Sequence, residues 1–488
     1  MRRFIFVAIF LYSVFGAPLR SIATDSVESL RSDLEAIFAD GRFANAQWGV
    51  KVVSLDNSET LFEKNALQLC IPASNNKIIT AAAALIRLGP QFRFETRILV
   101  DGPIGNGVLR GNLIVKGSGD PSNSQLFQPE NPFAVFKAWA LKLQELGIRN
   151  IKGNILGDTG AFDENKLGKG WEWDDLVQAY AAPISALQFN DSSIEVEISP
   201  GGAEGSSPSI WASPLTGYLA IENKLLTGPE DSSVAILIKP GRSLESIILS
   251  GSIPLNSPPE ILTVAAQSPV RYYLSALKHI LTEQGINTSD CDIMERRNYT
   301  PPSLSLLWSH SSPELSEILG PLLKESMNLY AETLTRTLGF TILGQGTFSN
   351  GRQIIEETLE EMGIAKGSYS YADASGLSRL NLASADTLVQ VLRHMHGHPH
   401  FDSFYNALPM AGVDGTLKHR LRDTPAMNNL RAKTGTIANV SAISGYLKSA
   451  DGEMLAFSMI ANNFLVGRKE AEQLQNRAIE RLASFSRK

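Results

Sequence analysis

The chain has 488 residues, of which 43% are hydrophobic and 19% are charged, as is typical of a folded globular protein. This length allows two or three domains, each with a core of its own. The formal net charge is −6, and an acidic chain of this kind argues against nucleic acid as a partner.

The N-terminus has the pattern of a secretory signal peptide, predicted at residues 1–23. Arg2 and Arg3 precede an apolar run at residues 4–17, and Ser21-Ile22-Ala23 offers a cleavage site of the small-x-small type. The run is short for a membrane span, and an uncleaved anchor is the alternative. Cleavage lowers the Lys and Arg count from 44 to 41 against 50 Asp and Glu, so we expect an exported chain of net charge about −9.

The first chemical motif is Ser74-Asn75-Asn76-Lys77. It opens an apolar stretch, residues 78–86, that predicts a buried helix with Pro72 just before its start. Ser74 then lies in the first turn, where free N–H groups and the helix dipole favour negative charge. Lys77 lies at i+3 on the same face, within reach of the Ser74 hydroxyl. Alone, the motif has a simpler interpretation, a serine N-cap with an incidental lysine.

A long stretch with its own strand and helix patterns follows, which predicts an insertion into one catalytic domain. The Gly117-x-Gly119 turn within it lacks the spacing of a phosphate-binding loop, so we interpret it as a simple turn. The expected elements are strands at residues 94–100, 108–116 and 151–156, and a helix at residues 136–146.

Residues 206–258 are rich in Ser, Pro and Gly and contain short apolar strands, which predicts a small all-β module nested in the insertion. A helix at residues 270–283 follows, and we expect the chain to return to the catalytic domain near Pro301. The predicted division is therefore a catalytic domain at residues 24–95 and 299–488, an insertion domain at 96–205 and 263–298, and a β-rich domain at 206–262.

The second motif, Ser326-Met327-Asn328, lies between two predicted helices, at residues 315–324 and 329–338. A polar S-x-N at such a junction can present its side chains into a cleft. The alternative is a turn in which Ser and Asn only cap the neighbouring helices.

The histidines and cysteines of the chain invite a metal site or a disulfide. His394, His396, His398 and His400 alternate, but Gly397 and Pro399 between them favour a solvated helix end over a metal site, and we expect no metal and no cofactor. Only two cysteines are present, Cys70 and Cys291. They do not form a disulfide scaffold, and whether they pair stays open.

The third motif, Lys433-Thr434-Gly435-Thr436, precedes a predicted hairpin with strands at residues 442–448 and 454–461. Gly435 allows another chain to approach the backbone closely, so an extended peptide can pair with this strand. The alternative is an ordinary strand with one surface lysine.

Residues 469–486 have apolar positions at helical spacing. We expect a helix packed on the sheet, with a membrane-surface helix as the alternative.

The three motifs together supply what serine acyl transfer requires, and their set is a known catalytic signature. Ser74 is the candidate nucleophile, and Lys77 is its base if burial and a second cation, Lys433, keep it neutral. Ser326 relays the proton to the leaving amine, and Asn328 holds the substrate amide and a lysine. Backbone N–H groups of Ser74 and Thr436 are the candidate oxyanion donors, and Lys433, Thr434 and Thr436 suit a substrate carboxylate.

The chain resembles the penicillin-binding D-alanyl-D-alanine carboxypeptidases and endopeptidases of the class C low-molecular-mass type (peptidase family S13, the penicillin-binding protein 4 group). The resemblance covers nearly the whole mature chain. It is carried by residues 71–74, 117–121, 180–187, 325–332, 373–379, 409–417 and 431–436.

The resemblance implies an α/β (α+β) fold of the serine β-lactamase and transpeptidase type, an antiparallel sheet between helices. It implies a periplasmic enzyme that acts on peptidoglycan stem peptides and is acylated by β-lactam antibiotics. A peripheral membrane contact and the oligomeric state stay open. Two departures from the family pattern are Asn75-Asn76 between the catalytic Ser and Lys, where Asn76 needs a polar partner, and Ala374 where the family has Gly.

Two other functions are weighed against this one. A serine β-lactamase needs a second base for deacylation, and no Glu-x-x-Leu-Asn segment lies between Ser326-Met327-Asn328 and Lys433-Thr434-Gly435. A catalytically silent peptidoglycan-binding scaffold gains slight support from Asn75 and Asn76, but the three intact motifs weigh against it. The sequence therefore favours a serine peptidase.

Overall fold

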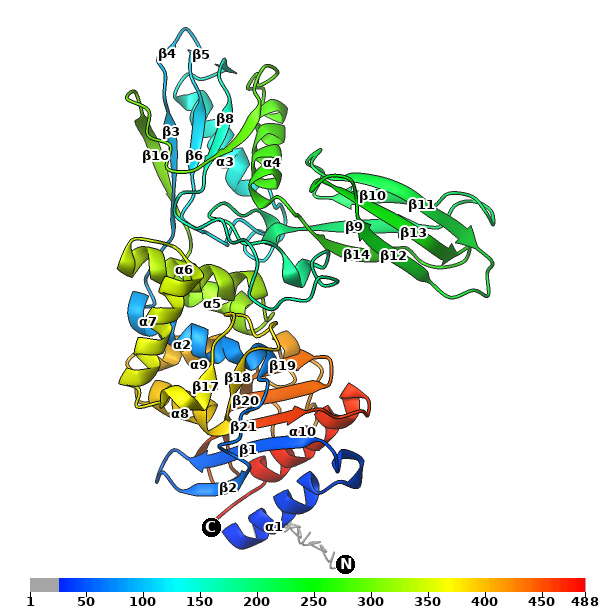
Figure 1. Cartoon of the computed structure of the whole chain (residues 1–488), viewed down its shortest axis with the longest axis vertical. Coiled ribbons are helices and arrows are strands. Elements are labelled where there is room, and N and C mark those ends of the chain that lie inside the picture. Colours follow the sequence, from blue (N-terminus) through cyan, green and yellow to red (C-terminus); the bar gives the residue numbers. More distant parts are fainter. Residues whose placement is uncertain (1–25, 488) are drawn as a thin grey trace, which may run out of the picture.

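The computed structural model describes residues 26–487, and the predicted signal peptide at residues 1–23 lies outside these residues. The chain forms three regions. Two of them, each a sheet with helices, follow one another along the long axis of the molecule, and the third, made of β-strands, projects to the side (Figure 1). Within residues 26–487 none of the helices combines the length and the apolar character that a bilayer crossing requires.

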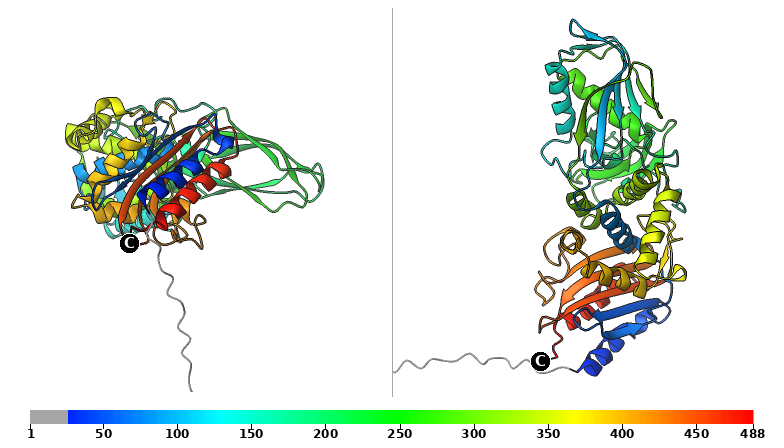
Figure 2. Two further views of the ribbon diagram at one scale, coloured as in Figure 1. Left: turned by 90° about the horizontal axis from the view of Figure 1, so that it is seen from below. Right: turned by 90° about the vertical axis from the view of Figure 1, so that its left-hand side faces the viewer.

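The first region is built on a five-stranded antiparallel sheet in the order β19-β20-β21-β1-β2. Its strands are β1 Gln47–Ser54, β2 Thr60–Lys64, β19 Arg431–Ile437, β20 Val440–Lys448 and β21 Met454–Asn462. Strand β20 is buried from Val440 to Leu447, so both faces of the sheet are covered. Helices α1 (Val27–Phe38) and α10 (Arg468–Ala483) cover one face (Figure 2).

A helical layer covers the other face. It begins with the 3₁₀ turn η2 (Ala73–Asn75) and α2 (Asn76–Leu88), in which every residue from Asn76 to Leu85 is buried. This follows from the apolar run in the sequence, since a helix that is apolar all round needs neighbours on every side. The other members are α5 Leu315–Leu323, α6 Asn328–Leu343, α7 Phe348–Glu361, α8 Ala385–His396 and α9 Phe401–Ala407. Two short strands, β17 Tyr369–Ser370 and β18 Leu382–Ala383, pair beside this layer.

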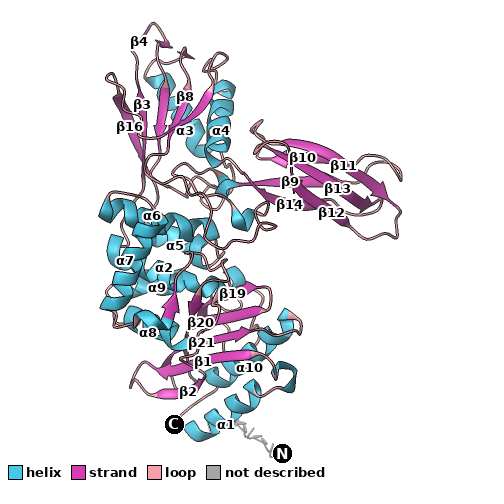
Figure 3. Ribbon diagram, in the orientation of Figure 1, coloured by secondary structure: helices cyan, strands magenta, loops and turns pink. Residues whose placement is uncertain are grey.

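The second region contains a five-stranded sheet in the order β15-β8-β6-β3-β16, with α3 (Ala134–Glu145) and α4 (Pro269–Glu283) (Figure 3). Its strands are β3 Glu95–Val100, β6 Leu113–Lys116, β8 Ile155–Asp158, β15 Ile293–Arg296 and β16 Ser305–Ser311. A small sheet joins β4 Ile104–Gly105, β5 Val108–Leu109 and β7 Asn150–Ile151. This region has its own core, in which Trp139, Tyr272 and Tyr273 are buried.

Two strands that the sequence predicts as continuous are each divided in two. Residues 108–116 form β5 and β6, and residues 151–156 lie in β7 and β8. The chain turns at Gly111 and Gly153, which approach each other so closely that a Cβ on Gly153 would lie 2.4 Å from the carbonyl carbon of Gly111. Glycine at such contacts allows backbone to meet backbone, which ends a regular strand.

The position of strand β16 differs from the prediction that the chain returns to the catalytic domain near Pro301. It lies beyond residue 299 and Pro301, yet it pairs with β3 at the edge of the second sheet. Trp308 of β16 is buried in the core of that region. The prolines before β16 favoured a domain boundary, but burial of this aromatic side chain keeps β16 in the second region. The chain therefore enters the catalytic domain only after β16.

The projecting region consists of two three-stranded sheets, β10-β9-β14 and β11-β13-β12, which branch away from the long axis (Figure 3). Its strands are β9 Ser193–Ser199, β10 Ser209–Ser213, β11 Ala220–Gly228, β12 Ala235–Pro240, β13 Ser246–Pro254 and β14 Glu260–Ala265. Since β9 pairs with both β10 and β14, the first sheet extends beyond the predicted range 206–262 on both sides. Val196 and Ile198 of β9 are buried, which explains why this strand joins the sheet.

Candidate active site

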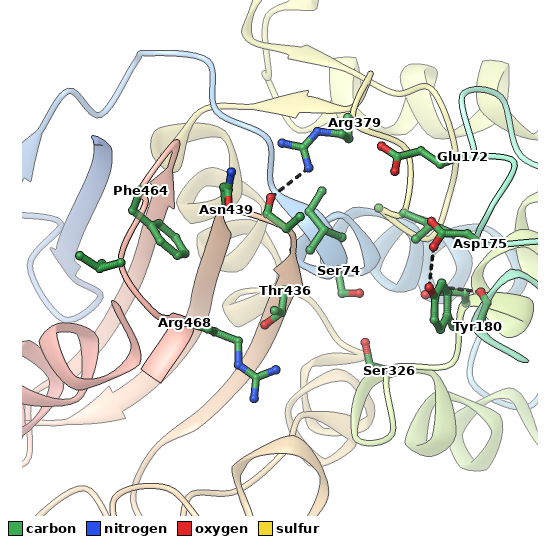
Figure 4. Close-up of a pocket in the computed structure, with 16 residues that line it drawn as sticks. Ser74, Glu172, Asp175, Tyr180, Ser326, Arg379, Thr436, Asn439, Phe464 and Arg468 are labelled. Carbon is green, nitrogen blue, oxygen red and sulfur yellow. Dashed lines mark hydrogen bonds between the residues drawn. The ribbon is translucent and has the colours of Figure 1, made fainter. Parts of the chain in front are cut away.

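The nucleophile candidate lies where the helical layer meets the edge of the first sheet. Ser74 is in the 3₁₀ turn that leads into α2, and Ala73 before it has φ +46°. This left-handed conformation is unfavourable for alanine, and strain of this kind concentrates at functional sites. Ser74 and Ser326 both line one pocket of about 730 Å³, from opposite sides (Figure 4).

Lys77 is fully buried directly behind Ser74. Its Nζ lies 2.9 Å from Ser74 Oγ, 2.6 Å from Asn328 Oδ1 and 2.7 Å from the carbonyl oxygen of Ser375. The Asn328 and Ser375 oxygens are acceptors only, so they take two N–H bonds of the lysine. A neutral amine then has its lone pair left for the Ser74 hydroxyl proton.

The charge of Lys77 is set by competing effects. Burial lowers the pKa of Lys77 to about 7, and the carboxylates of Asp373 and Glu332 oppose this shift. At neutral pH a large fraction of the side chain is therefore the free amine that general-base catalysis requires.

The amide of Asn328 is fixed from the other side. Its Nδ2 donates to the carbonyl oxygen of Tyr180 at 2.8 Å, so its Oδ1 faces Lys77. Asn328 is the first residue of α6, whereas Tyr180 comes from the inserted region. The insertion therefore helps to orient a residue that contacts Lys77.

Lys433 and Ser326 form a second pair of polar groups. Lys433 Nζ donates to Ser326 Oγ at 2.8 Å and to the Thr434 carbonyl oxygen at 2.7 Å. Burial, followed by repulsion from Lys77, lowers the pKa of Lys433 well below its ordinary value. Ser326, in the turn between α5 and α6, has φ +61° and lines the pocket.

The third motif lies on β19, the edge strand of the first sheet. A Cβ on Gly435 would lie 2.7 Å from the Pro72 carbonyl oxygen and 3.0 Å from the Ser74 nitrogen, so only glycine allows this approach of β19 to η2. Thr436 lines the pocket, and Thr434 Oγ1 donates to Thr416 Oγ1 at 2.7 Å. Apart from an isolated bridge between Arg431 and Met410, one side of β19 has no strand partner within the described residues, which leaves room for an extended peptide.

The loop that supplies the Ser375 carbonyl is held by a buried carboxylate. Asp373 accepts hydrogen bonds from the Gly376 and Ser378 nitrogens and from Asn381 Nδ2 at 2.6 to 2.8 Å. Gly376 has φ +84°, and a Cβ there would lie 1.9 Å from the Ala73 carbonyl oxygen. The loop and the nucleophile turn are therefore packed backbone to backbone.

The unusual asparagines beside Ser74 both have partners. Asn76 Nδ2 donates to the Asp373 carbonyl oxygen at 2.8 Å, and Asn75 Nδ2 donates to Ser444 Oγ at 2.7 Å. Asn76 thus has the partner that its burial requires, and it joins α2 to the loop around Ser375.

The pocket also contains charged residues that the sequence motifs do not include. Glu172, Asp175 and Arg379 lie on the side of Ser74 that faces the insertion, and Arg468 lies beyond Thr436 (Figure 4). Asp175 accepts from the Tyr180 hydroxyl at 2.5 Å, and Arg379 donates to the Ala438 carbonyl oxygen at 2.9 Å. The sequence offered one indication that Tyr180 and Arg379 belong to the site, namely that both lie in segments that resemble the family.

Cysteines and histidines lie away from this pocket. Cys70 and Cys291 are both free, buried thiols, so no bridge joins them. The histidine tract ends α8 and forms the turn before α9. Among residues 26–487 no group of three or more His, Cys, Asp or Glu side chains is arranged to hold a metal ion.

The buried lysine behind a serine, the Lys433–Ser326 pair and the edge strand together define a serine acyl-transfer enzyme with a transpeptidase-like fold. Residues 30–485 match the D-Ala-D-Ala carboxypeptidase 3 (S13) family. This chain belongs to that family and is a serine-type carboxypeptidase.

Relatives agree with this assignment over most of the chain. A D-alanyl-D-alanine carboxypeptidase of Actinomadura sp. (strain R39) is 32% identical over 444 residues, 89% of this chain and 81% of the relative. The D-alanyl-D-alanine carboxypeptidase DacB of Haemophilus influenzae is 28% identical over 431 residues, 86% of each chain. The crystal structure of penicillin binding protein 4 (dacB) from H. influenzae is similar at a TM-score of 0.79 and 26% identity, over 94% of this chain and 98% of that one.

Proposed function

We propose that this enzyme removes the terminal D-Ala from peptidoglycan stem peptides, and also cuts D-Ala cross-links, through an acyl-enzyme on Ser74. The observation that carries the proposal is the position of Lys77, whose two N–H bonds point to obligate acceptors while Ser74 Oγ lies 2.9 Å away. Such a lysine can take the serine proton directly.

The reaction proceeds in two stages. Ser74 Oγ attacks the carbonyl carbon of the penultimate D-Ala while its proton passes to Lys77, and the N–H groups of Ser74 and Thr436 stabilise the oxyanion. Collapse of the intermediate breaks the amide bond, and the leaving amine of D-Ala receives a proton through Ser326, which is hydrogen-bonded to Lys433. Water then hydrolyses the ester and restores the free Ser74 hydroxyl.

The outer pocket favours a substrate with charges of both signs. Arg379, whose guanidinium donates to the Ala438 carbonyl oxygen, lines the same pocket as Glu172 and Asp175 (Figure 4). The free amino and carboxyl groups at the end of a diamino acid side chain would be complementary to this arrangement. Thr434 and Thr436 would receive the terminal carboxylate, and the charge of that carboxylate would favour the protonated form of Lys433.

A β-lactam would react at the same serine. The H. influenzae enzyme has been crystallised in complex with a β-lactam, and that structure is similar to this chain at a TM-score of 0.76 and 26% identity. Opening of the ring leaves the amine attached to the acyl group, so no leaving group departs and the adduct blocks the site. Export to the periplasm, by way of the signal peptide predicted at residues 1–23, would bring the enzyme to its polymer substrate.

Release of D-Ala from a stem pentapeptide tests the proposal. We expect wild-type enzyme to release one D-Ala per peptide and Ser74→Ala to release none, with an unchanged thermal unfolding transition. Equal release by both proteins would contradict the role of Ser74. Cleavage of a cross-linked dimer of stem peptides, followed in the same assay, measures the endopeptidase activity.

A further inference from the structure

Helix α6 carries two buried charged residues on the same face as Asn328. Glu332 and Arg336 follow Asn328 at i+4 and i+8, so the three side chains form one row along the helix. The side chains of Glu332 and Arg336 are 0% and 1% exposed, and neither lines the substrate pocket. Buried charges are costly unless they are paired, so this row needs an explanation.

Glu332 holds the backbone that supports Lys77. Its Oε1 accepts from the Ala374 nitrogen at 2.8 Å and from the Ser375 nitrogen at 3.0 Å. The carbonyl oxygen of the same Ser375 accepts from Lys77 Nζ at 2.7 Å. Since Asn328 supplies the other acceptor, one face of α6 positions both oxygens that orient the base.

Arg336 favours the ionised form of Glu332. Its Nη1 lies 3.4 Å from Glu332 Oε2, its Nε lies 3.6 Å from Asp163 Oδ1, and its Nη2 donates to the Asn165 carbonyl oxygen at 2.8 Å. A guanidinium does not lose its proton, so burial of Arg336 favours a carboxylate beside it. Burial and then Asp373 raise the pKa of Glu332, and Arg336 and the two backbone N–H bonds oppose the shift, which leaves this pKa at about 7.

We propose that Glu332 is a positioning residue for acylation. It holds the Ser375 carbonyl against Lys77. Paired with Arg336, it also supplies negative charge near Lys77 when Lys77 takes the Ser74 proton. The inference rests on the proposed role of Lys77 as the base. Other charged or titratable groups face this cluster from the neighbouring elements, and they stay in place when only Glu332 is changed: Asp373, Tyr371, Lys433 and Asp163.

The test is the pH dependence of acylation in Glu332→Gln. Glutamine keeps an oxygen that can accept both backbone N–H bonds, but it removes the negative charge that favours protonated Lys77. The rate of benzylpenicillin adduct formation, followed by intact mass from about pH 5 to pH 9, should reach its plateau about one pH unit lower than in wild type.

Asp158→Asn is the matched control. Asp158 is another buried carboxylate that accepts backbone N–H bonds, from Gly160 at 2.9 Å and Asn298 at 2.8 Å, but it lies in the inserted region. We expect it to lower thermal stability and leave the midpoint of the pH profile unchanged. An unchanged midpoint in folded Glu332→Gln, with a rate reduced equally at every pH, would overturn the charge part of the proposal.

Glu332→Asp separates position from charge, and it serves also if Glu332→Gln does not fold. Aspartate keeps the carboxylate but is one methylene shorter, so we expect a midpoint near that of wild type and a plateau rate lower by on the order of 10-fold to 10²-fold. A wild-type plateau in Glu332→Asp would overturn the positioning role. Failure of wild-type enzyme to show any pH-dependent acylation would instead overturn the role of Lys77 itself.

Discussion

Lys77 Nζ lies within hydrogen-bond distance of three oxygen atoms, yet a neutral lysine has only two N–H bonds to give. The protonation state therefore decides the direction of the contact with Ser74. Under the proposed mechanism, protonated Lys77 donates to the serine oxygen and the site is at rest, whereas neutral Lys77 accepts from the hydroxyl and activates it. Burial, followed by repulsion from Lys77, lowers the pKa of Lys433 beside Ser326, so the site disfavours two protonated lysines at once.

The pH dependence of acylation follows from this residue. The pKa of Lys77 is lowered to about 7, so the active neutral form is scarce below that pH and dominant above it. The rate of benzylpenicillin acylation should therefore rise with pH through about 7 and then level off. A rate that is flat or falls over this range would contradict Lys77 as the base, and the measurement is adduct formation at a series of pH values.

The individual residues of the motifs could be predicted from the sequence, but the residues around them could not. Spacing predicted that Lys77 faces Ser74, because three residues span one helical turn. The requirement that buried Asn76 find a polar partner was also predictable. Its partner, the carbonyl of Asp373, lies 297 positions away in the chain and could not be named from local spacing. The same holds for Ser375, whose carbonyl completes the lysine site.

At the scale of elements, the contact between β19 and η2 determines the shape of the site. Gly435 lets the strand lie against the turn that carries Ser74, while Gly376 does the same for the loop on the other side. Ser74 is thus held between two backbones. The hairpin of β20 and β21 was predicted from its alternating pattern and turn. The segment around Gly435 was expected to be a strand that can pair with an extended peptide, and residues 431–437 form a strand at the edge of the sheet.

Gly435→Ala tests this contact. The added Cβ would lie 2.7 Å from the Pro72 carbonyl oxygen, so β19 must move away from Ser74. We expect a loss of about 1–3 kcal/mol in the free energy of unfolding and a larger loss in the acylation rate. Gly105→Ala in β4 is the control, since its Cβ has nothing within 4 Å. Wild-type acylation by Gly435→Ala would contradict the account.

At the scale of the whole molecule, the insertion completes the active site. Tyr180 fixes Asn328, Trp171 Nε1 donates to Asp373 Oδ2 at 2.8 Å, and Glu172 and Asp175 line the pocket. Local sequence patterns predicted an insertion and a β-rich module. They did not predict that β16 and β9 cross the expected boundaries, because strand pairing between distant segments leaves no local signal.

Trp171→Phe tests the link between the two regions. Phenylalanine keeps an aromatic ring but loses the hydrogen bond to the Asp373 carboxylate, a bond of about 1.5–3 kcal/mol. We expect kcat/KM for a stem pentapeptide to fall by about tenfold. Trp173→Phe is the control, since Trp173 is 84% exposed and should tolerate the change. Equal activity of the two variants would show that the link does not serve catalysis.

The most direct test of the central claim is the intact mass of the protein after incubation with benzylpenicillin, with peptide mapping of the adduct. The account predicts one stable adduct on Ser74 in wild type and none in Lys77→Ala, which should remain folded. An adduct on another residue, or normal labelling of Lys77→Ala, would contradict the Ser74–Lys77 assignment. Penicillin consumed without an adduct would indicate a β-lactamase, and penicillin left intact would indicate a silent scaffold.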